Sequence, residues 1–189
     1  MADKLIYIIT ARGGSSRIKN KNIKSFAGKP LIYWTIKQAL RVSEDNKIIL
    51  STDDEKIMKV CESFKKLIIV KRPKSLATPK ASSIDTVRHV IKKLSFDGFF
   101  ILLQPTSPLR LDSDINLAKK LLKKNAAVMS QYKFQYPISK INGNNKTSIF
   151  KSFHSYLKGS FFIPNGAIFG ASTKWIKDNN TFYNESVTT

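Results

Sequence analysis

Four short apolar runs recur along the first half of the chain, and each is followed by polar side chains. They are residues 5–10 (LIYIIT), 47–51 (KIILS), 67–71 (LIIVK) and 99–103 (FFILL). Runs of this length without polar alternation are typical of parallel strands that are buried on both faces. Stretches with the apolar spacing of helices lie between these runs, so the pattern predicts an α/β fold: a three-layer, doubly wound, mostly parallel sheet.

The helices expected between these strands have recognisable first turns. Pro30 opens an apolar-periodic stretch, Asp53 and Asp54 stand at the start of another, and Ser82 and Ser83 are plausible caps for a third. The expected helices span residues 30–40, 53–65, 84–94, 115–124 and 173–177, and further strands are expected at 126–130 and 166–170.

The length of 189 residues predicts a single domain. Residues 131–162 lack a clear pattern and contain Asn142-Gly143, a hairpin signal, so we expect an arm or meander there that could form a dimer contact. No apolar stretch is long enough for a membrane helix, and the first residues lack the features of a signal peptide. We therefore expect a cytoplasmic protein without a membrane partner.

The formal net charge of +20 admits two interpretations, a nucleic-acid-binding protein or a general lysine bias with a small anionic substrate. The lysines lie along the whole chain, often in pairs on expected helix faces, which is typical of solvated surfaces. No recognition-helix or aromatic RNA-binding motif is present, so we expect no nucleic-acid partner. Arginine is scarce, and four of the six lie near strand ends: Arg12, Arg17, Arg72 and Arg110.

Thiol and imidazole chemistry has little support in the sequence. Cys61 is the only cysteine, which excludes an internal disulfide, and its helical spacing with Ile57 and Phe64 favours a core position. His89 and His154 lie far apart in the chain and show no pairing pattern.

Ligands of doubly wound sheets bind beyond the carboxyl ends of the strands, so the residues after each strand are the candidate site. A glycine pair at Gly13 follows the first strand, with Arg12, Arg17, Lys19 and Lys21 supplying charge. The two common phosphate-loop spacings are absent. After the fourth strand, two prolines stiffen a loop in which Gln104, Thr106 and Ser107 can present hydrogen bonds.

Taken together, these strings resemble the acylneuraminate cytidylyltransferases, also called CMP-sialic acid synthetases. The strings occur in order as ARGGS (11–15), KN (21–22), GKPLI (28–32), STD (51–53), RP (72–73), ASS (81–83), LLQPTSPLR (102–110) and PNGAIF (164–169). The resemblance implies a nucleotide-diphospho-sugar transferase-like fold. It also implies a reaction in which the anomeric hydroxyl of a nine-carbon acid sugar attacks the α-phosphate of CTP and pyrophosphate leaves, with Mg²⁺ required and a homodimer expected.

The resemblance assigns roles residue by residue. Arg12 and Lys21 are the expected catalytic residues. The nucleotide is expected to contact Ala11, Arg12, Gly13, Asn22, Arg72, Ala81 and Ser83, and the acid sugar Gln104, Thr106, Ser107, Asn165 and Gly166.

Two departures from the family leave the acid sugar open. Many members carry lysine where this chain has Ser16, and Ser15-Ser16-Arg17 is similar to enzymes that activate 3-deoxy-manno-octulosonate. Residues 155–160 contain no arginine where many members have one. Alternatives are therefore an octulosonate or a legionaminic- or pseudaminic-type acid.

The metal-binding residues are unknown from the sequence, because the family's Asp-x-Asp pair for magnesium would lie beyond Thr189. The remaining aspartates are Asp53, Asp54, Asp85, Asp112 and Asp114, and none is expected to replace that pair fully. A chain that binds CTP but turns over poorly, or a non-catalytic nucleotide-binding homologue, is a further alternative.

Overall fold

The structure is a computed structural model, and it describes residues 4–15, 17–134, 140–142, 145–147, 161–183 and 187–189. Ser16, His154, Gly143 and residues 155–160, on which the sequence analysis commented, lie outside the described residues. The strands are β1 (Leu5–Thr10), β2 (Ser25–Phe26), β3 (Lys29–Pro30), β4 (Lys47–Thr52), β5 (Leu67–Lys71), β6 (Phe99–Leu103), β7 (Ala127–Phe134), β8 (Lys140–Asn142), β9 (Asn145–Thr147) and β10 (Phe161–Ser172). The helices are α1 (Leu31–Val42), α2 (Glu55–Cys61), α3 (Ser83–Lys93), α4 (Asp112–Leu122) and α6 (Thr173–Asp178), with 3₁₀ turns at Lys21–Ile23 and Lys74–Leu76.

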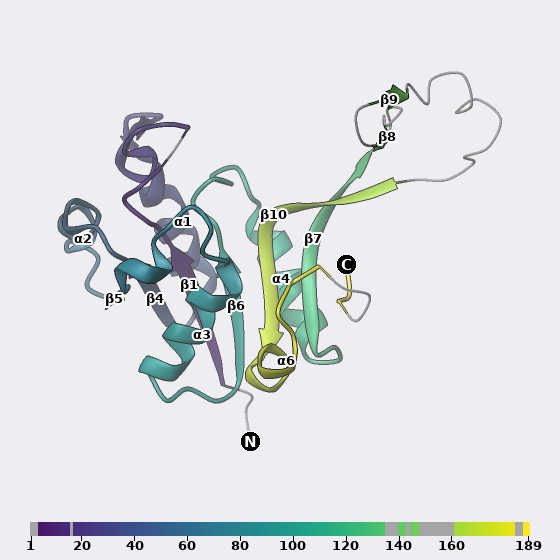
Figure 1. Cartoon of the computed structure of the whole chain (residues 1–189). Helices are drawn as coiled ribbons and strands as arrows, with labels where there is room; N and C mark the ends of the chain where they lie inside the picture. The colour runs from purple at the N-terminus through teal and green to yellow at the C-terminus, as the bar shows by residue number, and fades with distance from the viewer. Residues whose placement is uncertain (1–3, 16, 135–139, 143–144, 148–160, 184–186) are drawn as a thin grey trace. The chain divides into compact units, whose positions relative to one another are not determined.

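The described strands form a six-stranded sheet in the order β5-β4-β1-β6-β10-β7 (Figure 1). β1 pairs in parallel with β4 on one side and with β6 on the other, and β5 continues the parallel part beyond β4. β10 runs antiparallel to β6. The prediction of a mostly parallel, doubly wound sheet is confirmed.

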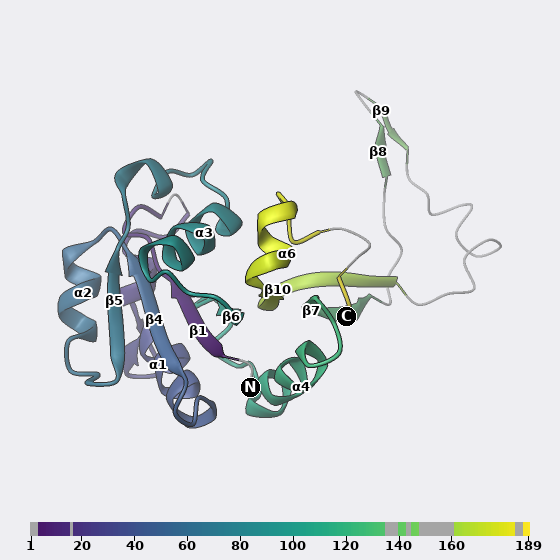
Figure 2. The same cartoon turned by 90° about the horizontal axis from the view of Figure 1, so that it is seen from below.

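Two apolar layers cover the sheet because successive residues of a strand face opposite sides. Tyr7 and Ile9 of β1 pack in the layer formed with α1, α2 and α4, whereas Ile6 and Ile8 pack in the layer formed with α3 and α6. Figure 2 shows α3 and α6 on one face and α1 and α4 on the other. Burial on both faces explains why the central strands read as continuous apolar runs.

Two helices differ from the sequence-based expectation because side-chain caps set their starts. The second helix begins at Glu55, since Asp54 Oδ1 accepts hydrogen bonds from the backbone N–H groups of Lys56 (2.7 Å) and Ile57 (3.1 Å). The fourth begins at Asp112, three residues earlier than expected, where Asp114 Oδ2 accepts from the N–H of Leu111 (3.1 Å). Residues 53–54 and 62–65 are therefore not part of α2.

The late strands are longer than expected. β7 continues to Phe134, and β10 begins at Phe161, where only residues 166–170 were expected to be extended. Residues 161–165 (FFIPN) include Pro164 and show no alternation that could predict a strand, and residues 131–134 (QYKF) alternate over too short a stretch. The sequence analysis also missed the small β2–β3 hairpin, whose turn places Ala27 and Gly28 at positive φ.

The chain divides into two compact units, residues 1–130 with 166–189 and residues 131–165. In the second unit β8 pairs antiparallel with β9, as the Asn142-Gly143 signal predicted. A role of this unit as an arm or a dimer contact stays a prediction. Among helices formed by described residues, none has the length and apolar character needed to cross a membrane.

Cys61 provides a test of the core. The residue is 1% exposed within the α1–α2 side of the core, and burial raises the pKa of its thiol to about 12. We expect Ellman's reagent to label Cys61 only after unfolding in urea, because the thiolate is the reactive form. Cys61→Ser should lower the free energy of unfolding by about 1–3 kcal/mol, since it buries a hydroxyl. Rapid labelling of the native protein would contradict this placement.

Candidate functional site

The candidate site lies where the chain leaves the middle of the sheet. β1 and β6 are adjacent parallel strands, and β4 and β5 lie on the far side of β1, so the strand order reverses between β1 and β6. The chain continues from β1 towards β4 and from β6 towards β7, so the two connections lead to opposite edges of the sheet. The gap between them is the usual ligand position in open α/β sheets. A cleft of about 410 Å³ lies at this position.

The segments that follow β1, β5 and β6 line this cleft, and the loop after β4 contacts residues of the first two. The lining residues are Thr10, Arg12, Ser15, Arg17, Lys21, Asn22, Arg72, Leu76, Thr78, Pro79, Ala81, Ser82, Ser83, Thr86, Gln104, Pro105 and Thr106. They follow β1, β5 and β6. The loop after β4 contributes Ser51 and Asp53, which contact cleft residues instead of lining the cleft themselves.

The cleft is cationic. Among the described residues that line it, four are basic (Arg12, Arg17, Lys21 and Arg72) and none is a carboxylate or a histidine. The pKa of Lys21 is lowered first by burial and then by the neighbouring charges of Arg17 and Arg12. These three cations from the loop after β1 thus lie close enough to repel one another, an arrangement that an anion would relieve.

Arg72 is the most constrained of these cations. It is 6% exposed, its Nη2 donates to the backbone carbonyl of Ser51 (2.7 Å), and its Nε donates to Ser51 Oγ (3.2 Å). Burial lowers the pKa of Arg72 to about 10, and the nearby Asp53 opposes that shift. At neutral pH the group is therefore still a cation, held in one orientation at the cleft wall.

Tertiary hydrogen bonds hold the loop after β1 in place. Arg12 Nη1 donates to the carbonyl of Thr78 (2.6 Å), across the cleft from its own strand. Asn22 Nδ2 donates to the carbonyl of Arg12 (2.9 Å), and the N–H of Gly13 donates to Asp53 Oδ1 (3.0 Å). The sequence did not predict these contacts of Thr78 and Asp53. The strand-end rule indicated that residues after β5 would face the site, but no local signal identifies the carbonyl of Thr78.

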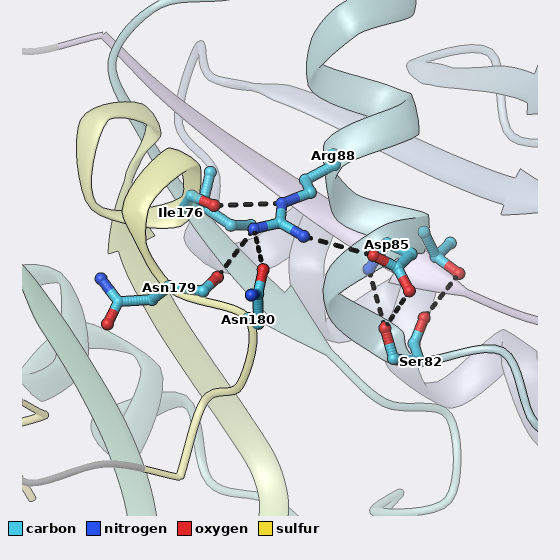
Figure 3. A network of polar contacts seen from close by, with 7 residues as sticks. Ser82, Asp85, Arg88, Ile176, Asn179 and Asn180 are labelled. Atoms are coloured by element: carbon cyan, nitrogen blue, oxygen red, sulfur yellow. Dashed lines mark hydrogen bonds and ion pairs between the residues drawn. The ribbon is translucent and has the colours of Figure 1, made fainter.

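The start of α3 forms another wall. Ser82 Oγ accepts from the N–H of Asp85 (3.1 Å) and donates to its carboxylate (2.6 Å), so the expected serine cap is confirmed. Arg88 contacts the same carboxylate (3.3 Å) and donates to the carbonyls of Ile176 (3.1 Å) and Asn179 (2.9 Å), as Figure 3 shows. This network fixes the helix start that presents Ala81 and Ser83 to the cleft.

The loop after β6 supplies the wall opposite the Arg12 loop. Gln104 and Thr106 line the cleft, and the N–H of Ser107 closes a turn onto the carbonyl of Gln104 (3.2 Å). Gly166 of β10 has φ +72°, and a Cβ there would lie 3.4 Å from Gln104 Oε1. Gln104 and Gly166 are therefore neighbours although 62 positions separate them in sequence.

Most of the residues expected from the sequence gather at this cleft. Eight line it: Arg12, Lys21, Asn22, Arg72, Ala81, Ser83, Gln104 and Thr106. Ala11, Gly13, Ser107 and Gly166 are adjacent through the contacts described above or through the chain. Asn165 belongs to the other compact unit, so it is not placed against the cleft. Arg110, one of the four arginines noted near strand ends, donates to protein acceptors.

The aspartates do not form a cation site. No group of three or more His, Cys, Asp or Glu side chains with metal-binding geometry occurs in the part of the chain that the structure describes. Asp54 and Asp114 accept backbone N–H groups at helix starts, and Asp112 is paired with Arg41 (2.8 Å). Hard cations prefer several carboxylate oxygens, so these residues do not fit a magnesium site by themselves.

Comparison with known proteins agrees with the geometry. The profile of the cytidylyltransferase family matches residues 6–153. The chain belongs to this family. It is 33% identical to the N-acylneuraminate cytidylyltransferase of Escherichia coli over 97% of this chain and 46% of that protein, so the chain spans about half of that relative.

Two further relatives are matched over most of their length. The pseudaminic acid cytidylyltransferase of Campylobacter jejuni is 32% identical over 95% of this chain and 83% of that protein. The CMP-N,N'-diacetyllegionaminic acid synthase of Legionella pneumophila is 32% identical over 96% of this chain and 84% of that protein. The resemblance noted in the sequence is thus confirmed.

Solved structures support the cytidylyltransferase fold. The CMP:2-keto-3-deoxy-manno-octonic acid synthetase complexed with CTP matches with a TM-score of 0.70 and 20% identity, over 93% of this chain and 76% of that one. The 4-diphosphocytidyl-2C-methyl-D-erythritol synthase of Anaerococcus prevotii matches with a TM-score of 0.64 and 18% identity, over 92% and 73%. At these identities the likeness concerns the fold alone.

The packing of the glycine pair gives a matched pair of variants. A Cβ at Gly13 would lie 2.2 Å from Asp54 Oδ2 and 2.7 Å from Asp54 Cβ, whereas a Cβ at Gly14 meets nothing within 4 Å. Gly13→Ala should therefore lower the free energy of unfolding by about 1–3 kcal/mol, because Asp54 must leave its cap position. Gly14→Ala is the control and should change the free energy of unfolding little. Equal urea midpoints for the two variants would show that Gly13 is not tightly packed.

Proposed function

We propose that this cytidylyltransferase transfers CMP from CTP to the anomeric hydroxyl of an acid sugar and releases pyrophosphate. The observation that carries the proposal is the cleft between the ends of β1 and β6, lined by four cations and no carboxylate, in a chain of this family. Such a cleft suits a triphosphate, since phosphate oxygens are bound by arginine and lysine side chains.

The triphosphate is assigned to the loop after β1. Arg12 and Lys21 supply charge, Asn22 fixes the carbonyl of Arg12, and the backbone at Ala11 and Gly13 borders the same loop. The mutual repulsion of Lys21, Arg12 and Arg17 supports this assignment, because an anion placed among them lowers the electrostatic energy.

The cytosine and ribose are assigned to the opposite wall, at Arg72, Ala81 and Ser83. Arg72 is held by Ser51, and the start of α3 is fixed by the Ser82–Asp85 cap, so these groups are oriented before a ligand arrives. Preorganised polar groups favour binding because little freedom is lost when the ligand is bound.

The acid sugar is assigned to Gln104, Thr106, Ser107, Asn165 and Gly166. The first two line the cleft, and Gly166 lies against Gln104. Asn165 is included on the resemblance of the PNGAIF string.

The chemistry is an in-line displacement at phosphorus. A bond forms between the sugar's anomeric oxygen and the α-phosphorus, the bond to the pyrophosphate oxygen breaks, and the hydroxyl proton passes to solvent. The cleft lining, as far as the structure describes the chain, offers no carboxylate or imidazole as a base. Catalysis therefore depends on positioning and on charge neutralisation by Arg12 and Lys21. The Mg²⁺ requirement, the homodimer and the cytoplasmic location expected from the family remain predictions.

Removal of one phosphate contact tests the nucleotide half. Arg12→Ala should weaken CTP binding by about 2 kcal/mol, roughly 30-fold in Kd, because a charge-assisted hydrogen bond is lost. Isothermal titration calorimetry measures this directly. Arg41→Ala is the matched control, since it removes the same charge from a residue that pairs with Asp112 and does not line the cleft. An unchanged Kd for Arg12→Ala would remove Arg12 from the site.

A substrate panel tests the sugar half and its alternatives. We expect CTP-dependent pyrophosphate release with N-acetylneuraminate or a similar nine-carbon acid sugar. A legionaminic- or pseudaminic-type acid is the second candidate, because relatives named for those sugars match as well as the neuraminate relative. The panel also includes 3-deoxy-manno-octulosonate. CTP binding without turnover of any sugar, with Mg²⁺ present, would favour a non-catalytic nucleotide-binding homologue.

A further inference from the structure

Arg110, in the loop between β6 and α4, joins three elements around the end of the cleft that holds Gln104. It is 8% exposed. Its Nη2 donates to the carbonyl of Gln104 (2.7 Å), its Nε to the carbonyl of Ala167 in β10 (2.9 Å), and its Nη1 to Oε1 of Gln38 in α1 (2.8 Å). All three nitrogens of the guanidinium thus have a protein acceptor.

The charge of Arg110 is not paired. Its three acceptors are two backbone carbonyls and an amide, and the contacts between described residues give it no ion pair with a carboxylate. Burial lowers the pKa of Arg110 to about 10, and the more distant Asp114 opposes this shift. A buried cation with neutral acceptors is an expensive way to stabilise a fold, because an apolar side chain avoids the desolvation. Its presence indicates that the directed hydrogen bonds themselves are needed.

Those hydrogen bonds act on the backbone at two of the residues assigned to the sugar, Gln104 and Gly166. One goes to the carbonyl of Gln104, and another goes to the residue directly after Gly166. Gly166 has positive φ, and a Cβ there would lie in ordinary contact with Gln104 Oε1, at 3.4 Å, so the two residues are direct neighbours. The spacing between Gln104 and Gly166 is therefore set through one planar group that reaches both backbones.

A second layer holds Arg110 in turn. Gln38, 3% exposed, accepts from Arg110 Nη1 and donates from Nε2 to the carbonyl of Arg110 and to Asp112 Oδ1 (3.1 Å). Asp112 also binds Arg41 through two hydrogen bonds (2.8 and 2.9 Å). The position of the guanidinium is thus determined by α1 and α4, away from the nucleotide half of the cleft.

We propose that Arg110 is a positioning residue for the acid sugar: by holding the Gln104 and Ala167 carbonyls together, it sets the gap between Gln104 and Gly166 and thereby the sugar that is accepted. The inference rests on the proposed function. Arg110 itself does not contact the substrate. It acts on the sugar half of the cleft, whereas other residues hold the nucleotide half.

The test compares two ligands in the same variants. Arg110→Lys and Arg110→Met should raise the KM for the preferred acid sugar about tenfold or more, because a displacement of the order of 1 Å at a binding group has effects of this size. They should also reduce the preference for that sugar over the others in the panel. The Kd for CTP, from calorimetry on the same samples, should stay within about twofold of wild type, because those contacts lie elsewhere.

Two controls keep the test decisive. Lys119→Met removes a cation of α4 that pairs with Glu44 (2.7 Å), outside the contacts that hold Arg110, and should leave both sugar KM and sugar preference unchanged. Should the Arg110 variants fail to fold, Gln38→Met keeps the cation but removes the Nη1 acceptor, and a smaller rise in sugar KM with unchanged CTP binding is expected.

The outcomes separate the two proposals. A wild-type chain that transfers CMP to no acid sugar contradicts the proposed function. An active wild type whose Arg110 variants keep the sugar KM and preference, or lose CTP affinity by the same factor, overturns the positioning role. The same conclusion follows if the Arg110 variants do not fold and Gln38→Met behaves as wild type.

Discussion

The parallel pairing of β1 with both β4 and β6 is the constraint on which the site depends. β1 is buried on both faces and hydrogen-bonded along both edges, which fixes the position of its carboxyl end. The chain leaves β1 and β6 in opposite directions, and a cleft opens between the two exits. The residues that follow these strands thus face one another without being near in sequence.

Two buried arginines frame this cleft, and both bind backbone carbonyls. Arg72 fixes the wall assigned to the base through Ser51, while Arg110 fixes the wall assigned to the sugar through Gln104 and Ala167. In a chain with 27 lysines, both of these positions carry the planar fork of arginine, which donates to more than one acceptor at fixed angles. Arg72 lines the cleft and Arg110 does not. The scarcity of arginine therefore indicated important positions, but not the role of each arginine.

The parts of the structure that depend on local pattern were predictable. The bounds of β1, β5 and β6 follow from their apolar runs, because strands buried on both faces carry that signal directly. The start of α2 was missed because the carboxylate of Asp54 decides it, and the extension of β10 was missed because residues 161–165 show no alternation. The cleft residues were found through the strand-end rule and the family strings. Contacts such as Arg12 with Thr78 join segments far apart in the chain and have no sequence signature.

The hydrogen bond from the Gly13 amide to Asp53 has a consequence for ligand exchange. An aspartate already occupies the donor of the glycine loop, so the loop keeps its shape with an internal anion in place. An oxyanion that binds this amide must displace the Asp53 carboxylate, a charged acceptor of similar strength. The binding free energy then gains only the difference between the two hydrogen bonds. The Gly13 amide therefore adds little to the net affinity for an oxyanion that displaces Asp53.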